Sequence, residues 1–138
     1  MIFFQARQKS VSAIRRHQTF SPEEQETWGA PEIMTIIVFL VDTSASMQQR
    51  SWISGRSTFL DIAKGAVEFF VKLRQKSPES RGDRYMLLTF EEYPRNIKAG
   101  WKENLQTFMS ELKNLEANGM TTMGTALKQV FDILNINR

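Results

Sequence analysis

The stretch that decides the fold is residues 35–46, TIIVFLVDTSAS, in which a continuous apolar run stops at an aspartate followed by alternating hydroxyls. Such a run predicts a strand buried on both faces, as in a parallel sheet covered by helices. Ligand sites in these sheets lie at the carboxyl ends of the strands. There, Asp42, Ser44 and Ser46 offer hard oxygen donors, which suit Mg²⁺, Mn²⁺ or Ca²⁺ better than a soft metal. The sequence therefore predicts a hard-cation site.

The composition limits the classes of protein that the chain can belong to. Its 138 residues suffice for one domain with a substantial core. It contains no cysteine, which excludes disulfides and thiolate zinc sites. The formal charge of +3 is modest and the basic residues are spread along the chain, so nothing indicates nucleic-acid binding. The longest apolar run, 36–41, is far shorter than the roughly 20 residues of a membrane-spanning helix.

Residues 1–33 differ in composition from the rest of the chain. The first twenty include arginine and lysine but no acid, and a polar, acidic stretch follows them. We expect a flexible amino-terminal extension, because Pro31 marks a boundary and Met34 stands directly before the first strand. A mitochondrial transit peptide is the alternative for an arginine- and serine-bearing segment without acids. The predicted organisation is an extension at 1–33 and an α/β domain at 34–138.

From residue 34 onward the hydrophobic periodicity alternates between strand and helix. The predicted strands lie at 35–41, 85–90 and 96–99, the last as a short edge strand. The predicted helices lie at 59–76, 102–117 and 123–135. Asn118 and Gly119 are expected to stop the second helix. The order βαββαα predicts a doubly wound, Rossmann-like α/β fold, with a further parallel strand and helix to follow.

A second hydroxyl loop, GMTTMG at residues 119–124, precedes the third predicted helix. Either loop alone could be a helix cap, because Asp, Ser and Thr are favoured there. Together, at the ends of neighbouring segments of a doubly wound sheet, the loops resemble the metal-ion-dependent adhesion site of von Willebrand factor type A domains. Residues 34–138, which include FLVDTSASM and LDIAKGAVEFFVKLR, are similar to the amino-terminal half of that domain in the Integrator complex subunit 6 family.

The resemblance implies particular ligands. Asp42, Ser44 and Ser46 correspond to the family's first metal loop. Thr121 corresponds to its second loop, and the implied ion is Mg²⁺. The family's third metal loop, an aspartate after a later strand, would follow Arg138. We therefore expect a partial type A domain, truncated after the third helix, that holds the metal weakly.

The resemblance also implies a non-catalytic protein-interaction scaffold of the nuclear Integrator complex. Its implied roles are small nuclear RNA 3′-end processing and RNA polymerase II transcription termination, and its implied partners are other Integrator subunits and protein phosphatase 2A. No nucleic-acid or membrane contact is expected. The enzyme alternative is a Mg²⁺-dependent phosphohydrolase with Asp42 as nucleophile, although Ser44 stands where haloacid dehalogenases place a second acid. The only histidine, His17, lies outside the domain. A truncated, non-functional isoform is the third alternative.

Four smaller patterns carry further expectations. The Arg-Gly-Asp tripeptide at 81–83 is expected to be a turn between helix and strand rather than an integrin ligand. Trp52 lies in the polar loop beside the metal turn, where it could serve an interface or pack into the core. Phe108 lies on an apolar helical stripe that predicts core packing. The predicted buried faces also include Leu73 on the first helix and Phe131 on the third.

Overall fold

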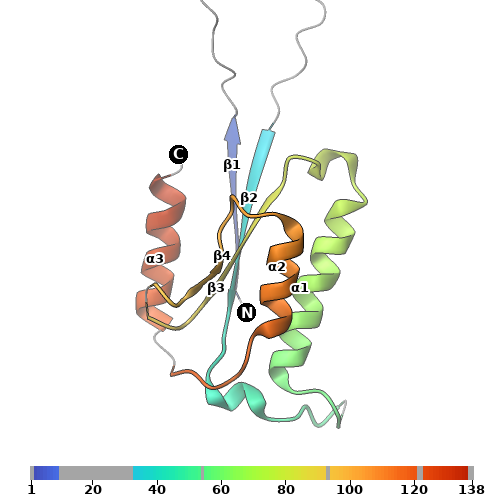
Figure 1. The fold of residues 1–138 in the computed structure, drawn as a ribbon, viewed down its shortest axis with the longest axis vertical. Helices are drawn as coiled ribbons and strands as arrows, with labels where there is room; N and C mark the ends of the chain where they lie inside the picture. The colour runs from blue at the N-terminus through green and yellow to red at the C-terminus, as the bar shows by residue number, and fades with distance from the viewer. Residues whose placement is uncertain (1, 10–32, 54, 93, 121–122, 137–138) are drawn as a thin grey trace, which may run out of the picture.

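A four-stranded mixed sheet, in the order β1-β2-β3-β4, forms the centre of the fold (Figure 1). The structure is a computed structural model that describes residues 2–9, 33–53, 55–92, 94–120 and 123–136. Its strands are β1 (Ile2–Lys9), β2 (Ile33–Val41), β3 (Arg84–Thr89) and β4 (Ile97–Ala99). Its α-helices are α1 (Phe59–Gln75), α2 (Leu105–Asn114) and α3 (Met123–Ile136). Two 3₁₀ turns are η2 (Ala45–Gln48) and η3 (Pro78–Ser80).

The strand pairing confirms the predicted α/β fold. Strands β2 and β3 run parallel, from the pair Ile36 and Arg84 to the pair Val41 and Thr89, and α1 forms the crossover between them. Strand β4 pairs antiparallel with β3 as the predicted short edge strand. Strand β1 pairs antiparallel with the other side of β2. The carboxyl ends of β2 and β3 therefore lie at one edge of the sheet, where a site was predicted.

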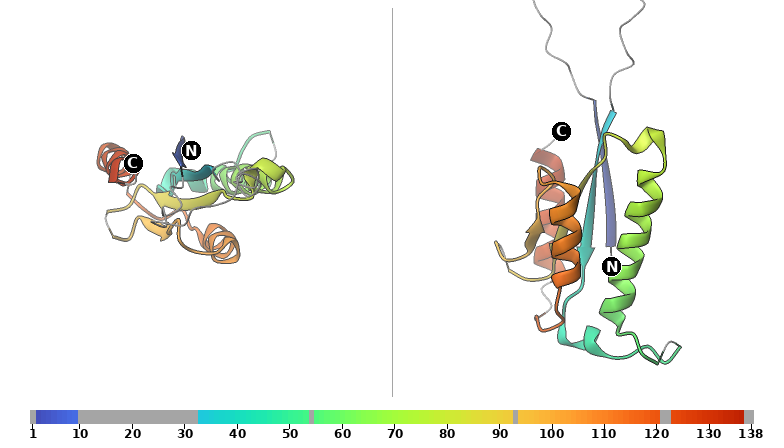
Figure 2. Two further views of the ribbon diagram at one scale, coloured as in Figure 1. Left: turned by 90° about the horizontal axis from the view of Figure 1, so that it is seen from above. Right: turned by 45° about the vertical axis from the view of Figure 1, so that its right-hand side comes forward.

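The two faces of the sheet carry separate hydrophobic clusters, so the fold has three layers (Figure 2). Alternate residues of β2 point to opposite faces, as the period of a strand requires. Phe39 belongs to the cluster under α1 and α2, and Phe108 packs there with a ring-centroid distance of 5.9 Å from it, which confirms the predicted core role of Phe108. Val38 belongs to the cluster under α3, together with Val130.

Capping residues fix where the helices begin. Helix α1 starts after Thr58, whose side chain accepts a hydrogen bond from Asp61 N–H, while Asp61 accepts one from Thr58 N–H. Helix α2 starts after Asn104, whose side chain accepts from Thr107 N–H at 2.8 Å. That cap explains why α2 begins three residues later than predicted.

Several boundaries differ from the sequence-based expectations. Helix α2 ends at Asn114, so the expectation that Asn118 and Gly119 stop it is wrong. Leu73 and Phe131 were predicted on buried faces but are 57% and 53% exposed. Helical periodicity identifies a face without showing how far the neighbouring layer extends over it.

No strand was predicted before Met34, yet β1 lies within the segment expected to be an extension. Residues 10–32 of that segment lie outside the described part of the chain. Among the described helices, none combines the length and hydropathy needed to cross a bilayer.

Candidate metal-binding edge

The turn after β2 brings three predicted ligands together. Ser44 N–H donates to Asp42 Oδ1 at 2.8 Å, which folds the turn back on the carboxylate. The hydroxyl groups of Ser44 and Ser46 form a hydrogen bond with each other, with their oxygens 2.9 Å apart. Ser44 is the N-cap residue of η2, yet its side chain makes no capping hydrogen bond. The observed turn thus lacks the contact that the helix-cap alternative requires at Ser44.

This geometry fits a small hard cation. Ligands at about 2.0–2.1 Å from Mg²⁺, in neighbouring octahedral positions, lie about 2.8–3.0 Å from one another. The distance between the hydroxyl oxygens of Ser44 and Ser46 falls in that range. Asp42 Oδ1 accepts from the backbone, and its carboxylate is half-buried at the strand tip. One carboxylate and two hydroxyls match the donor set that Mg²⁺ prefers, with water completing its coordination.

The second loop lies against the first through backbone hydrogen bonds. Gly119 N–H donates to Thr43 O at 3.0 Å, and Ala45 N–H donates to Gly119 O at 3.2 Å. A Cβ atom at Gly119 would lie 3.4 Å from Thr43 O, so the absence of a side chain eases this approach. The two loops meet at the same edge of the sheet, as predicted. Thr121, the ligand predicted from this loop, lies outside the described residues, and its placement stays a prediction.

A glutamine that sequence reasoning did not single out also joins the loops. Gln48 Nε2 donates to Ala117 O at 2.6 Å, across 69 positions of the chain. The contact ties η2 to the segment that leads into the second loop (Figure 1). No sequence signal identifies it, because a polar residue in a loop has many possible partners.

Exposed apolar side chains lie on the loop after η2 and on the second loop. Trp52 is 88% exposed, which excludes the core-packing alternative for this side chain. Ile53 and Met120 are also exposed large hydrophobic residues. An open pocket of about 560 Å³ lies beside the second loop, and its lining includes Glu92 and Met120. Glu91 forms an ion pair with Lys98, with Glu91 Oε1 3.0 Å from Lys98 Nζ.

The aspartate of the Arg-Gly-Asp tripeptide does not contribute to a metal or ligand site. Within the described ranges, no group of three or more histidine, cysteine, aspartate or glutamate residues could hold a metal ion. The carboxylate of Asp83, in the Arg-Gly-Asp tripeptide, is only 2% exposed and accepts from Arg74 Nε at 2.9 Å. That hydrogen bond raises the pKa of the Arg74 guanidinium. The tripeptide therefore forms the predicted turn, with its aspartate engaged inside the protein.

Comparison with known families agrees with this fold. The model of the von Willebrand factor type A domain matches residues 37–138, which is more than half of the chain. The chain therefore belongs to the von Willebrand factor type A domain family.

Within that family, the chain is similar to Integrator complex subunit 6. It is 64% identical to the subunit of Danio rerio and 65% identical to that of Homo sapiens, each over 105 residues. It is 63% identical to the subunit of Drosophila melanogaster over 106 residues. The matches cover 76% of this chain but 12%, 12% and 8% of those proteins, so the chain spans a small part of the relatives it matches.

Proposed function

We propose that the chain is a non-catalytic recognition module that holds Mg²⁺ at the edge described above and contacts partner proteins there. Asp42, Ser44 and Ser46 would hold the ion from the first loop, and Thr121 from the second. The observation that carries this proposal is the Ser44–Ser46 hydroxyl pair beside Asp42, hydrogen-bonded to each other at 2.9 Å and not used to cap η2. A bound Mg²⁺ would supply a positive charge that attracts an oxygen ligand from a partner.

The similarity to Integrator complex subunit 6 supports a role inside that nuclear complex. We infer that the chain acts as a scaffold in small nuclear RNA 3′-end processing and RNA polymerase II transcription termination. Its partners would be other Integrator subunits and the protein phosphatase 2A module. The exposed Trp52 and Met120 would add apolar contacts beside the metal.

The phosphohydrolase alternative has less support. One oxygen of the Asp42 carboxylate accepts from Ser44 N–H, and Ser44 occupies the position where that class of enzyme needs an acid. A carboxylate nucleophile also needs a nearby group that protonates the leaving oxygen.

Affinity purification from nuclear extract tests this proposal. Tagged wild-type chain, Asp42→Ala and Asp132→Ala are compared in Mg²⁺ and in EDTA, and Integrator subunits are quantified by mass spectrometry. Asp132 is an exposed acid on α3, so its variant controls for loss of a charge. We expect EDTA and Asp42→Ala to reduce recovery of the subunits while Asp132→Ala leaves it unchanged. Equal recovery in all samples would refute metal-dependent recognition, and recovery of no Integrator subunit would refute the scaffold role.

A further inference from the structure

Helix α1 carries a second apolar face that the described part of the chain leaves exposed. Its large hydrophobic residues are Phe59, Ile62, Phe69 and Leu73, and Phe69 is the most exposed of them at 69%. Together with Ala66, which is also exposed, they recur at alternating intervals of three and four residues. This is the spacing of the seam along which one helix packs on another. We call these five residues the outer seam of α1.

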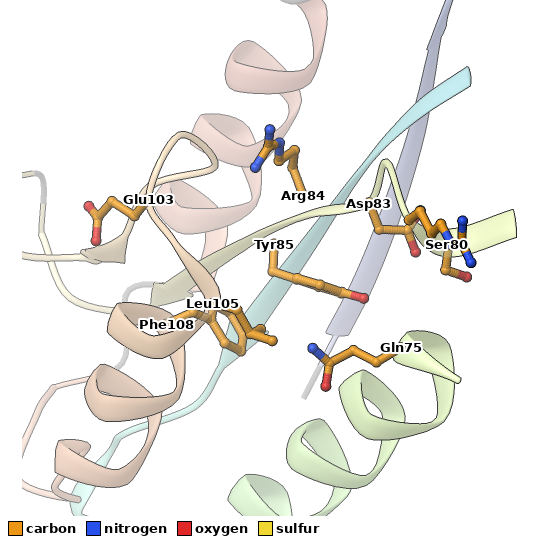
Figure 3. Close-up of a pocket in the computed structure, with 9 residues that line it drawn as sticks. Gln75, Ser80, Asp83, Arg84, Tyr85, Glu103, Leu105 and Phe108 are labelled. Atoms are coloured by element: carbon orange, nitrogen blue, oxygen red, sulfur yellow. The ribbon is translucent and has the colours of Figure 1, made fainter. Parts of the chain in front are cut away.

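The outer seam is distinct from the face by which α1 packs on the sheet. Leu60, Val67 and Val71 are buried on that inner face, in the cluster that also contains Tyr85 and Phe108. Figure 3 shows Tyr85 between α1 and α2. At 3.6 residues per turn, the outer seam lies about a third of a turn round the helix from the inner face. A surface helix needs one apolar stripe to join a core, so the second stripe calls for an occupant of its own.

Small residues stand at the centre of this outer seam. Gly65 and Ala66 are both exposed in the middle of α1, and a Cβ atom at Gly65 would meet no atom within 4 Å. No described neighbour therefore requires a glycine at this position, although glycine inside a helix is destabilising. The distance between two packed helices depends on the side chains at their contact, and small ones allow a close approach. A second helix that packs closely on α1 accounts for both residues.

The charges beside the seam complement those of the same helix in the opposite direction. Asp61 lies in the first turn of α1, while Lys72 lies in the last turn and Lys76 caps its end. A hydrogen bond from the Thr58 backbone lowers the pKa of the Asp61 carboxyl, which is therefore charged at neutral pH. Lys72 pairs with Glu68, whereas Lys76 forms no ion pair within the described ranges. When two α1 helices pack antiparallel, the acidic start of each lies beside the basic end of the other, and their dipoles are opposed.

We propose that the outer seam of α1 binds a second copy of this chain, through antiparallel packing of the two α1 helices about a two-fold axis. Phe69 of each copy packs against Ala66 of the other, and Leu73 of each copy packs against Ile62 of the other. Such an interface uses the same surface twice, as a two-fold dimer requires. A single helix pair belongs to the interfaces of less than about 1,200 Å² that form weak complexes, so the dimer dissociates readily on dilution.

The dimer would make the proposed recognition module bivalent. Helix α1 begins beside the metal-binding edge, where Phe59 N–H donates to Gln49 O at 3.0 Å. Antiparallel packing therefore places the two metal-binding edges at opposite ends of the dimer. Two linked recognition sites bind a partner that carries two matching sites more tightly than one site does. Self-association itself does not depend on the metal, because the outer seam contains none of the proposed ligands.

Analytical ultracentrifugation of the full chain in EDTA tests the proposal, from low to high micromolar concentration. We expect the average mass to rise with concentration from 16.0 kDa toward twice that value. Phe69→Glu should lower the association constant about ten-fold or more, because it places a charge in the apolar contact. Ile53→Glu is the matched control, since Ile53 is also an exposed large hydrophobic residue but lies outside α1. It should associate as the wild type does. Circular dichroism of each variant checks that the helices remain folded.

Disulfide cross-linking tests the orientation of the helices. The chain contains no cysteine, so Ile62→Cys and Leu73→Cys each introduce a single thiol. On oxidation, a mixture of the two variants should form a disulfide-linked dimer, whereas each variant alone should form far less. Equal cross-linking of each variant with itself would exclude antiparallel packing.

Two results of the ultracentrifugation would overturn the proposal. One is a mass of 16.0 kDa at every concentration, which would favour a different protein as the occupant of the seam. The other is an association constant that Phe69→Glu leaves unchanged or that Ile53→Glu lowers equally, because the contact would then lie elsewhere on the chain.

Discussion

Replacing Gln48 with alanine tests how the two loops of the metal-binding edge are held together. The bond from Gln48 Nε2 to Ala117 O, at 2.6 Å, is the side-chain contact between η2 and the segment before Gly119. A neutral hydrogen bond contributes about 0.5–1.5 kcal/mol net, and a buried acceptor left without a partner adds to the cost. Ala117 is 5% exposed but Gln48 is exposed, so water can replace part of the lost contact. We expect Gln48→Ala to lower the free energy of unfolding by about 1 kcal/mol.

Urea unfolding followed by circular dichroism measures this change. For a chain of this length, a loss of about 1 kcal/mol corresponds to a fall in melting temperature of roughly 2–8 °C. Gln49→Ala is the matched control, because Gln49 is the same residue type at the next position and is exposed. Its side chain makes no hydrogen bond in the described part of the chain, so its free energy of unfolding should change by less than about 0.5 kcal/mol.

The same urea unfolding experiment, repeated in Mg²⁺, tests whether Gln48 affects metal binding. A ligand that binds only the folded state stabilises it according to its concentration and affinity. If Gln48 positions the second loop, Mg²⁺ should stabilise the wild type and Gln49→Ala more than Gln48→Ala. Unfolding curves for Gln48→Ala that match those of the wild type would refute the reasoning, because the bond would then contribute nothing to holding the loops.

Three other measurements address catalysis, pH dependence and the buried ion pair. The protein should not hydrolyse aryl phosphates in Mg²⁺, and turnover that Asp42→Asn abolishes would favour the enzyme alternative. Because the pKa of Tyr85 is raised in the folded state, the unfolded chain loses its phenol proton first, and the free energy of unfolding should fall as the pH rises above 10.0. Tyr85→Phe should reduce that fall, and identical alkaline profiles would contradict the assignment. Asp83→Asn should lower the free energy of unfolding by about 1–2 kcal/mol, since it removes the charged partner of Arg74; a denaturation midpoint equal to that of the wild type would exclude a stabilising role for the pair.

The sequence predicts the central part of the fold well because local patterns and packing agree there. The apolar run before Asp42 forms β2, which is buried on both faces from Ile36 to Val41. The helical spacing after Thr58 forms α1, and the capping box of Thr58 and Asp61 reinforces its start. Where local preference and burial point to the same structure, sequence reasoning is most reliable.

Pairing between distant segments is harder to predict. Strand β1 pairs with β2 although residues 10–32 separate the two strands in the sequence. The preference of a segment for strand structure depends strongly on such a partner. Leu73 and Phe131 follow the helical period but lie partly beyond the layer that covers the sheet.

Individual polar side chains differ in the same way. The turn of Asp42, Ser44 and Ser46 could be predicted, because its residues are adjacent and its chemistry follows from their type. The unpartnered hydroxyl of Tyr85 could not be predicted, since Tyr85 stands in an apolar strand whose pattern indicates only core packing. Its surroundings come from the end of α1, from η3, from the start of β3 and from the start of α2.

Calorimetric titration with Mg²⁺ and Mn²⁺ tests the central claim most directly, namely that the turn after β2 is a metal site. The wild type, Asp42→Ala and the surface control Asp132→Ala are titrated under the same conditions. We predict weak, saturable binding heat for the wild type and for Asp132→Ala, and its loss in Asp42→Ala, because Asp42 is the one carboxylate in the proposed ligand set. Equal heats for the wild type and Asp42→Ala would contradict a metal site at this edge of the sheet.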